Sequence, residues 1–267
     1  MKRSLGVAVA AVALLALTSC AGVNPRVPLK FTAAHGRFAV QVTRQVVRAA
    51  ANHQVPLQTL TEKDLVRIDS LLPGPPTTVT LTVGDPDQIL PSTGTSGFTD
   101  PESGAVTIGL YPYWAEEPPD FAGWLARTLA RQVSHSVRVE AGPGLGTTLL
   151  DQLVTEGVAT AFDEAAFPGP KDPWVEALSP LQECQQWQHL KPVLNRVGLY
   201  QQVMTGGPVQ RSIFAESTMP PLTGLAIGYQ ILAHYLRRHP SQRWGELVTT
   251  SGGAIFAHSG FAPCPAV

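Results

Sequence analysis

The sequence predicts an α+β domain that is mainly helical and carries a small β-sheet packed against one long helix. Apolar residues recur at helical spacing in several long segments, whereas the short segments 77–83 and 105–110 alternate with a period of two. Their order along the chain indicates helices first, then the strands, then helices to the end. No internal repeat, low-complexity tract or long linker interrupts residues 31–267, which are therefore expected to form a single domain.

The chain begins with a segment typical of a secretory signal. Met1-Lys2-Arg3 is positively charged, and Leu5 to Leu17 form an apolar run without a charged residue. This run is shorter than the roughly 20 residues that a membrane-spanning helix needs. Residues 1–19 are therefore predicted to be a signal peptide and not a permanent membrane span.

The end of this segment, Leu17-Thr18-Ser19-Cys20, resembles the lipobox of bacterial lipoproteins. The resemblance implies cleavage before Cys20 and lipidation of that cysteine, which would anchor an exported protein in a membrane of the bacterial cell envelope. Several acyl chains would give a durable anchor, since each buried methylene contributes about 0.8 kcal/mol. Residues 20–30 would then form an extended tether. An ordinary signal peptide followed by a chance cysteine is the alternative.

The charge of the chain argues against a nucleic-acid partner. The formal net charge is −1, and loss of Lys2 and Arg3 with the signal peptide would change it to −3, because two positive charges are removed. No basic stripe that could neutralise phosphates is present. The expected partner that follows from the N-terminal segment is instead a membrane, reached through lipidated Cys20.

The two remaining cysteines, Cys184 and Cys264, allow one intramolecular pairing. An exported protein occupies a compartment that permits disulfides, so we expect the two to be bonded. The alternative is two separate thiols. A metal site at either cysteine is disfavoured, because neither lies in a Cys-x-x-Cys motif or a Cys/His cluster.

Helices are predicted in the first part of the domain. Phe38, Val42, Val46 and Ala50 recur at four-residue spacing and predict one helix. A second, shorter helix is expected to be capped by Thr61. Its apolar residues are Leu65, Ile68 and Leu72.

The pattern changes to that of strands after Pro76. Residues 77–83 alternate with strand period and are rich in β-branched side chains, and residues 105–110 repeat this signature. The two segments are expected to pair in one sheet. The turn-rich residues 94–104 between them suit a hairpin or a lid.

Two further helices are the most informative elements. The first is predicted over residues 120–139, with a row of apolar residues at four-residue intervals facing a core. The second begins near Thr147 and carries Glu156 along an otherwise apolar stripe. A carboxylate in that place needs a cation or hydrogen bonds, because burial of an isolated charge costs several kcal/mol.

Residues 125–138 of the first helix resemble the active-site helix of a family of predicted zinc-dependent proteases, whose pattern is roughly Ala-His-Glu-x-x-His-x-x-Arg. Further similarity follows in order at residues 146–159, at Pro173-Trp174 and at residues 222–229, where Gly224 and Gly228 lie four apart. The resemblance implies a zincin-like metallopeptidase fold, with the small sheet packed on the active-site helix.

Zincin chemistry explains what the pattern is for, and this chain departs from it. In zincins, two histidines at i and i+4 bind zinc, the glutamate between them is the general base, and a third ligand completes the site. His135 matches the second histidine, and Glu156 fits a third ligand on the following helix. Arg131 stands in place of the first histidine and Gln132 in place of the glutamate. Arginine has no lone pair for zinc, and glutamine cannot accept the proton of a water molecule.

The resemblance and its departures together predict a non-catalytic binding or regulatory pseudo-protease, with a peptide or protein ligand in the inherited groove and no cofactor. Arg131 is expected to occupy the place of zinc and to bond Glu156, with His135 lining the same pocket. One alternative is an active zinc metallopeptidase that uses His135, Glu156 and an unusual further ligand. Another is a structural envelope lipoprotein without a groove function.

Overall fold

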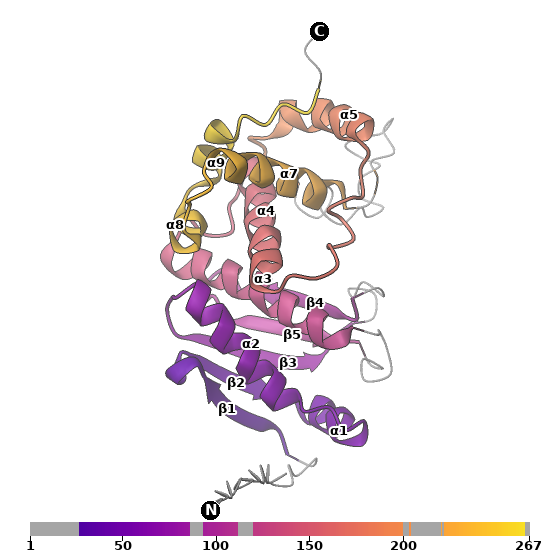
Figure 1. The fold of residues 1–267 in the computed structure, drawn as a ribbon, viewed down its shortest axis with the longest axis vertical. Helices are drawn as coiled ribbons and strands as arrows, with labels where there is room; N and C mark the ends of the chain where they lie inside the picture. The colour runs from indigo at the N-terminus through magenta and orange to yellow at the C-terminus, as the bar shows by residue number, and fades with distance from the viewer. Residues whose placement is uncertain are drawn as a thin grey trace, which may run out of the picture.

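The computed structural model describes residues 27–85, 93–111, 120–199, 203, 220 and 222–264. The predicted signal peptide and Cys20 lie outside the described residues. Figure 1 shows a β-sheet with helices α1 and α2 at one end of the molecule and a group of helices at the other, with the long helix α3 between them. The α+β class predicted from the sequence is confirmed.

The sheet has five strands, which pair in the order β1-β2-β3-β5-β4. The central strands β2, β3 and β5 are parallel, and the edge strands β1 and β4 run antiparallel to their neighbours. One face of each central strand is buried in the core, as an alternating pattern requires. The strand bounds are β1 (Leu29–Ala33), β2 (Phe38–Val42), β3 (Thr77–Val83), β4 (Thr95–Thr99) and β5 (Val106–Leu110).

The two strands predicted from alternation are confirmed and lie side by side, with Val79 opposite Val106 and Leu81 opposite Ile108. The turn-rich segment before β5 forms the predicted hairpin. After β4, the Asp100 carboxylate accepts a 2.7 Å hydrogen bond from the Ser103 amide, and Gly104 adopts a positive φ of +65°.

The prediction of a helix beginning at Phe38 is wrong. Phe38 and Val42 belong to β2, and helix α1 (Arg44–Asn52) begins only after Thr43. A spacing of four fits both periods, since it is two strand repeats and about one helical turn. The alternation of buried Phe38, Val40 and Val42 with exposed neighbours is the pattern that the fold uses. The sheet therefore begins before the first helix.

The start of the second predicted helix is also corrected. Helix α2 (Leu57–Leu71) begins after Pro56, so Thr61 lies inside the helix and is buried instead of capping it. The predicted apolar residues Leu65, Ile68 and Leu72 are all fully buried. The helix is thus one turn longer than predicted at its N-terminus.

The two informative helices are confirmed as α3 (Phe121–Ala141) and α4 (Leu149–Ala166). The Asp120 side chain caps α3 by accepting a hydrogen bond from Gly123, and Thr148 caps α4 by accepting one from Asp151. Helix α3 packs against β4, β5, α2 and α4, so the predicted packing of a small sheet on a long helix is also confirmed.

Six further helices are described, one near the start of the domain and five after α4. The elements not yet named are η1 (Ala34–Gly36), α5 (Pro180–Leu190), η3 (Lys191–Val193), α7 (Thr223–Arg238), α8 (Trp244–Thr249) and α9 (Gly252–Ser259). Within the part of the chain that the structure describes, no helix has the length and apolarity needed to cross a membrane.

Helices α4 and α7 approach each other so closely that two glycines face across the contact. A Cβ atom placed on Gly157 would collide with the backbone carbonyl of Gly228, and one on Gly228 would collide with the carbonyl of Leu153. These obstacles are backbone atoms, which cannot move aside as the end of a flexible side chain can. The pair therefore fixes how α7 lies on the helix that carries Glu156.

We predict that Gly157→Ala lowers the free energy of unfolding by about 1–3 kcal/mol, because the helices must separate to admit the methyl group. Urea denaturation would measure the loss. Gly253→Ala is the matched control, since a Cβ atom there meets nothing within 4 Å and alanine favours a helix. Equal stability of the two variants would contradict this account of the crossing.

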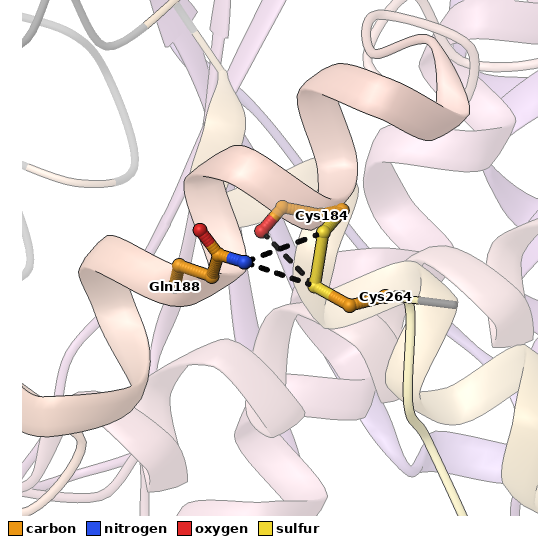
Figure 2. The surroundings of a disulfide bond; sticks show 3 residues. All are labelled: Cys184, Gln188 and Cys264. Atoms are coloured by element: carbon orange, nitrogen blue, oxygen red, sulfur yellow. Dashed lines mark hydrogen bonds between the residues drawn. A yellow bond between two sulfur atoms is a disulfide. The ribbon is translucent and has the colours of Figure 1, made fainter. Parts of the chain in front are cut away.

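The predicted disulfide between Cys184 and Cys264 is present and links residues 80 positions apart (Figure 2). Cys184 lies on α5, and Cys264 lies near the end of the described chain. The Gln188 side chain lies beside the bond, with its Nε2 atom 3.7 Å from each sulfur. The bond therefore fastens the segment after α9 to α5.

Reduction of this disulfide should lower the melting temperature by roughly 5–15 °C. The cross-link restricts the unfolded chain and thereby adds about 2–4 kcal/mol to the free energy of unfolding. Calorimetry with and without a thiol reductant would measure the change. A variant carrying both Cys184→Ala and Cys264→Ala should melt at the lower temperature, and the reductant should not change its melting temperature. A parent protein whose melting temperature is also unchanged by the reductant would contradict the prediction.

Candidate functional site

The residues that the sequence analysis singled out lie where α3 packs on α4. Arg127, Arg131 and His135 follow one another at four-residue intervals on α3, so they lie along one side of that helix. Glu156 and Asp163 lie seven residues apart, or about two turns, on α4. All five residues are largely buried, so their charges must be compensated inside the protein.

The two arginines share two buried carboxylates. Arg127 Nη2 lies 2.8 Å from Asp163 Oδ1 and 3.1 Å from Asp172 Oδ2. Arg131 Nη2 bonds the other oxygen of Asp163 and lies 2.9 Å from Asp172 Oδ2. Both aspartate side chains are fully buried. The four side chains form a charge-balanced cluster, which we call the arginine–aspartate cluster.

The segment after α4 completes this cluster. Asp172 comes from that segment, and the Pro170 carbonyl accepts a further hydrogen bond from Arg127. The Trp174 ring lies against the Arg131 guanidinium, 4.3 Å from ring centroid to Cζ. The Trp174 indole donates a 3.2 Å hydrogen bond to Thr160 on α4. Arg131 is thus held between two carboxylates and an aromatic face.

His135, one turn after Arg131 on α3, forms a separate contact with Glu156 on α4. His135 Nε2 lies 3.7 Å from Glu156 Oε2, and both side chains are buried. Burial lowers the pKa of His135, and the charges of Arg131 and Arg138 act in the same direction, whereas Glu156 acts to raise it. The imidazole is therefore neutral at pH 7, the form in which histidine binds metals.

Gln132 faces the sheet and not the arginine–aspartate cluster. The Thr99 hydroxyl lies 2.9 Å from the Gln132 side-chain oxygen and donates toward it. The Gln132 side chain also fills the space beside Gly97, where a Cβ atom would overlap it. Gln132 therefore joins α3 to the edge strand β4, and its amide serves as a packing and hydrogen-bonding group.

Arg138 is the last residue of the sequence pattern, and it is fully buried. Its Nε donates a 2.9 Å hydrogen bond to Thr155 on α4, and its Nη1 donates to the carbonyls of Val248 and Thr250 at 2.8 and 2.9 Å. Arg138 thereby joins α3, α4 and the end of α8. Its role in this structure is to connect helices.

Comparison with known protein families gives one match. Residues 57–256 match the model of DUF2268, described as predicted Zn-dependent proteases. The chain belongs to this family. No curated protein and no solved structure gave a significant match. The match spans α2 through most of α9 and so contains every residue of the site.

One expectation about this DUF2268 domain is corrected. Within the described residues, the ion pairs of Arg131 are with Asp163 and Asp172 and not with Glu156. Burial acts to lower the pKa of Arg131, but the charges of Asp163, Asp172 and Glu156 outweigh it, so the net shift is upward. Glu156 thus contributes to the field at Arg131, while the guanidinium bonds Asp163, two turns further along α4, and Asp172 in the segment after α4. The described contact of His135 is with Glu156.

Arg127, Asp163 and Asp172 were not predicted as site residues from the sequence. The sequence contains a signal for Arg127 and Asp163. Arg127 lies one turn before Arg131 on a mostly buried helix, so it also needs a carboxylate partner. Asp163 lies two turns after Glu156, on the same side of α4, and was the available choice. Asp172 lies in an irregular segment, and nothing in its local sequence indicates where that segment folds.

The family name raises the question of zinc, and the described residues do not fit a hydrolytic zinc site. Arg131 has no lone pair to donate and is held by two carboxylates, and Gln132 cannot act as a base. His135 and Glu156 would supply two ligands, fewer than the three protein ligands of catalytic zinc sites. In residues 27–85, 93–111, 120–199 and 222–264, no group of three or more His, Cys, Asp or Glu side chains is placed to hold a metal ion.

Arg131→Ala should lower the free energy of unfolding by about 3–5 kcal/mol, because it leaves Asp163 and Asp172 to share one cation in the interior. Chemical denaturation would measure the change. The control is Arg243→Ala, whose exposed pair with Glu246 should contribute less than about 0.5 kcal/mol. Adding Asp172→Asn to Arg131→Ala should recover part of the loss. Equal effects of the two single arginine variants would contradict the assignment of Arg131 to a buried cluster.

Proposed function

We propose that this chain is an exported, lipid-anchored member of the DUF2268 family whose domain binds a peptide or protein ligand without hydrolysing it. The observation that carries the proposal is the state of Arg131. It stands at the position of the first zinc ligand in the family pattern, and its guanidinium is held by two buried carboxylates. The place of a ligand to the metal is thus taken by a cation.

The surroundings of Gln132 and His135 support the same proposal. Gln132 stands at the position of the general base, but it hydrogen-bonds Thr99 and fills the space beside Gly97. His135 keeps the identity of a zinc ligand, and its contact is with Glu156. A zincin needs three convergent ligands and a base, so we infer that the zincin-like architecture serves binding here.

Lipid anchoring rests on the sequence Leu17-Thr18-Ser19-Cys20, and it places the domain outside the cytoplasm on a short tether. Mass spectrometry of the N-terminal peptide of the membrane-extracted protein tests this directly. A diacylglyceryl-modified, acylated Cys20 is the expected result. A mature chain that begins elsewhere, or an unmodified Cys20, would overturn the anchoring.

An active zinc peptidase is the second candidate, and the proximity of His135 and Glu156 is the observation that favours it. Their facing atoms lie 3.7 Å apart, which is close enough for both to reach one metal ion. A further ligand and a base would have to come from other residues or from the substrate. Zinc binding and peptide cleavage separate the two candidates.

We predict that the parent protein takes up less than one equivalent of zinc at micromolar concentration. A variant with Arg131→His and Gln132→Glu should bind zinc stoichiometrically, because the new side chain at position 131 would join His135 and Glu156 as a third ligand. Asp172→Asn should be included to restore the charge balance around Asp163. Thr99 can donate to a glutamate at position 132 as it does to the glutamine. Isothermal titration and metal analysis after dialysis would measure uptake.

The control for this experiment is Asp172→Asn alone, which should bind no more zinc than the parent. Stoichiometric uptake of zinc by the parent, together with peptide cleavage that a chelator abolishes, would overturn the non-catalytic proposal. It would favour the peptidase.

A further inference from the structure

A cavity of about 450 Å³ lies apart from His135 and Glu156, where α2, the start of α3 and the segment after α4 meet. Asp64, Lys63 and Arg67 reach it from α2, Trp124 from the first turn of α3, and Phe167 from the end of α4. It is large enough for a small organic group or an amino-acid side chain. Neither the family match nor the proposed function assigns a role to it.

Asp64 is the unusual group in this cavity. Its residue is only 7% exposed, although solvent still reaches its carboxylate oxygens. Within the described part of the chain, no side chain or backbone group donates a hydrogen bond to this carboxylate or forms an ion pair with it. The other buried aspartates, Asp163 and Asp172, are each bonded by two arginines. A buried carboxylate without such partners is costly, and a donor from a ligand would offset that cost.

The cations around the cavity do not fill this role. Arg127 is engaged with Asp163, Asp172 and the Pro170 carbonyl. Arg67 donates to the Ala166 carbonyl and lies against the Phe167 ring, 5.8 Å from ring centroid to Cζ. Lys63 is exposed, so water screens its charge. Arg67 is also exposed, and its hydrogen bond goes to a neutral carbonyl, so it keeps its positive charge at the cavity, screened by water like that of Lys63. Asp64 is the buried charge of the cavity that no described residue bonds.

The exposed carboxylate of Asp120, which accepts a hydrogen bond from the Gly123 amide, also lines the cavity. The other walls are mainly apolar. Trp124 and Phe167 contribute aromatic rings, and Pro168 and Pro170 contribute apolar surface beside them. A cavity with a single buried anionic acceptor and aromatic walls suits a cation on an apolar or planar stem.

We propose that this cavity binds an ammonium or guanidinium group, with Asp64 as its acceptor and with Trp124 and Phe167 against its stem. The group would come from a free organic amine or from a lysine or arginine side chain of a peptide. The site does not involve His135 or Glu156, so it is independent of whether the family's zinc chemistry is lost.

The titration of Asp64 agrees with this assignment. Burial raises the pKa of Asp64 to about 6, and the charge of Lys63 acts to lower it. The carboxylate is therefore mostly ionised at pH 7 and mostly protonated at pH 5. Binding of a cation should weaken as the pH falls through this interval, because a protonated carboxyl no longer attracts it.

The test is calorimetric titration of the purified full chain with benzamidine, whose amidinium is planar, cationic and carried on an aromatic ring. Neutral benzamide and anionic benzoate are the matched probes. Benzamidine should bind at least about tenfold more tightly than either, the factor expected of a charge-assisted hydrogen bond. A peptide with one arginine, compared with the same peptide carrying citrulline, separates a peptide source from a free amine.

Asp64→Asn should weaken benzamidine binding at least about tenfold, since it keeps the shape and removes the charge. Glu62→Gln is the control, because it removes the same charge from α2 at a residue that bonds Gln58 and does not line the cavity. If Asp64→Asn fails to fold, the parent alone suffices, because its affinity for benzamidine should fall between pH 7 and pH 5.

Three results would overturn the proposal. The first is no binding of benzamidine or the arginine peptide at millimolar concentration. The second is binding of benzoate or benzamide as tight as that of benzamidine. The third is an affinity for benzamidine that neither Asp64→Asn nor acidification to pH 5 changes.

Discussion

The arginine–aspartate cluster is the interaction on which the centre of this protein depends. Arg127 and Arg131 come from α3, Asp163 from α4, and Asp172 from the irregular segment that follows α4. Each charge is costly to bury alone, and its compensation requires the others to be in place. The three segments are therefore fixed together: the crossing of α3 and α4 sets the position of Asp163, and the fold of the next segment is set by the need to bring Asp172 inside.

The cluster also bears on the proposed loss of the metal site, because it joins the two helices that a zincin joins through its metal ion. A zinc ion in a zincin joins two helices through ligands from both. In this DUF2268 domain, α3 and α4 are joined by Arg131 with Asp163 and, two turns along α3, by Arg138 with Thr155. Gln132 joins the same helix to β4 through Thr99. Arg131 and Gln132, which depart from the family pattern, thus each connect α3 to another element of the fold. This structural role supports the proposal of a binding domain.

The buried carboxylates Asp163 and Asp64 differ in their bonding partners. Burial raises the pKa of Asp163 to about 7, with the charge of Asp172 acting in the same direction and the charges of Arg131 and Arg127 acting to lower it. Asp64 is without such partners in the described structure, and its cavity has aromatic walls and an opening for a ligand. Arg127 touches both places, since it belongs to the cluster and also lines the cavity. Compensation by the protein itself at one carboxylate, and by a bound cation at the other, is the physical distinction between them.

The sequence by itself determined the elements with a clear period and a local cause. The strands at 77–83 and 105–110, the helices α3 and α4 with their capping residues nearby, and the pairing of Cys184 with Cys264 followed from alternation, helical spacing and cysteine parity. It also determined that Arg131 cannot bind zinc, because that is a property of the guanidinium and not of the fold. At Phe38 and Val42 the four-residue spacing fits two periods, so the helix predicted from it was wrong, and pairing with β1 and β3 makes this segment a strand.

Only the tertiary structure decided which partner each buried charge received. Arg131 lies on a helix that faces several carboxylates, and its bonding to Asp163 and Asp172 in place of Glu156 depends on the crossing of α3 and α4 and on the path of the segment after α4. The cavity around Asp64 likewise arises from three segments that are distant in sequence. Such contacts are long-range, so no local pattern encodes them, and the energy of a buried charge depends on the whole of its surroundings.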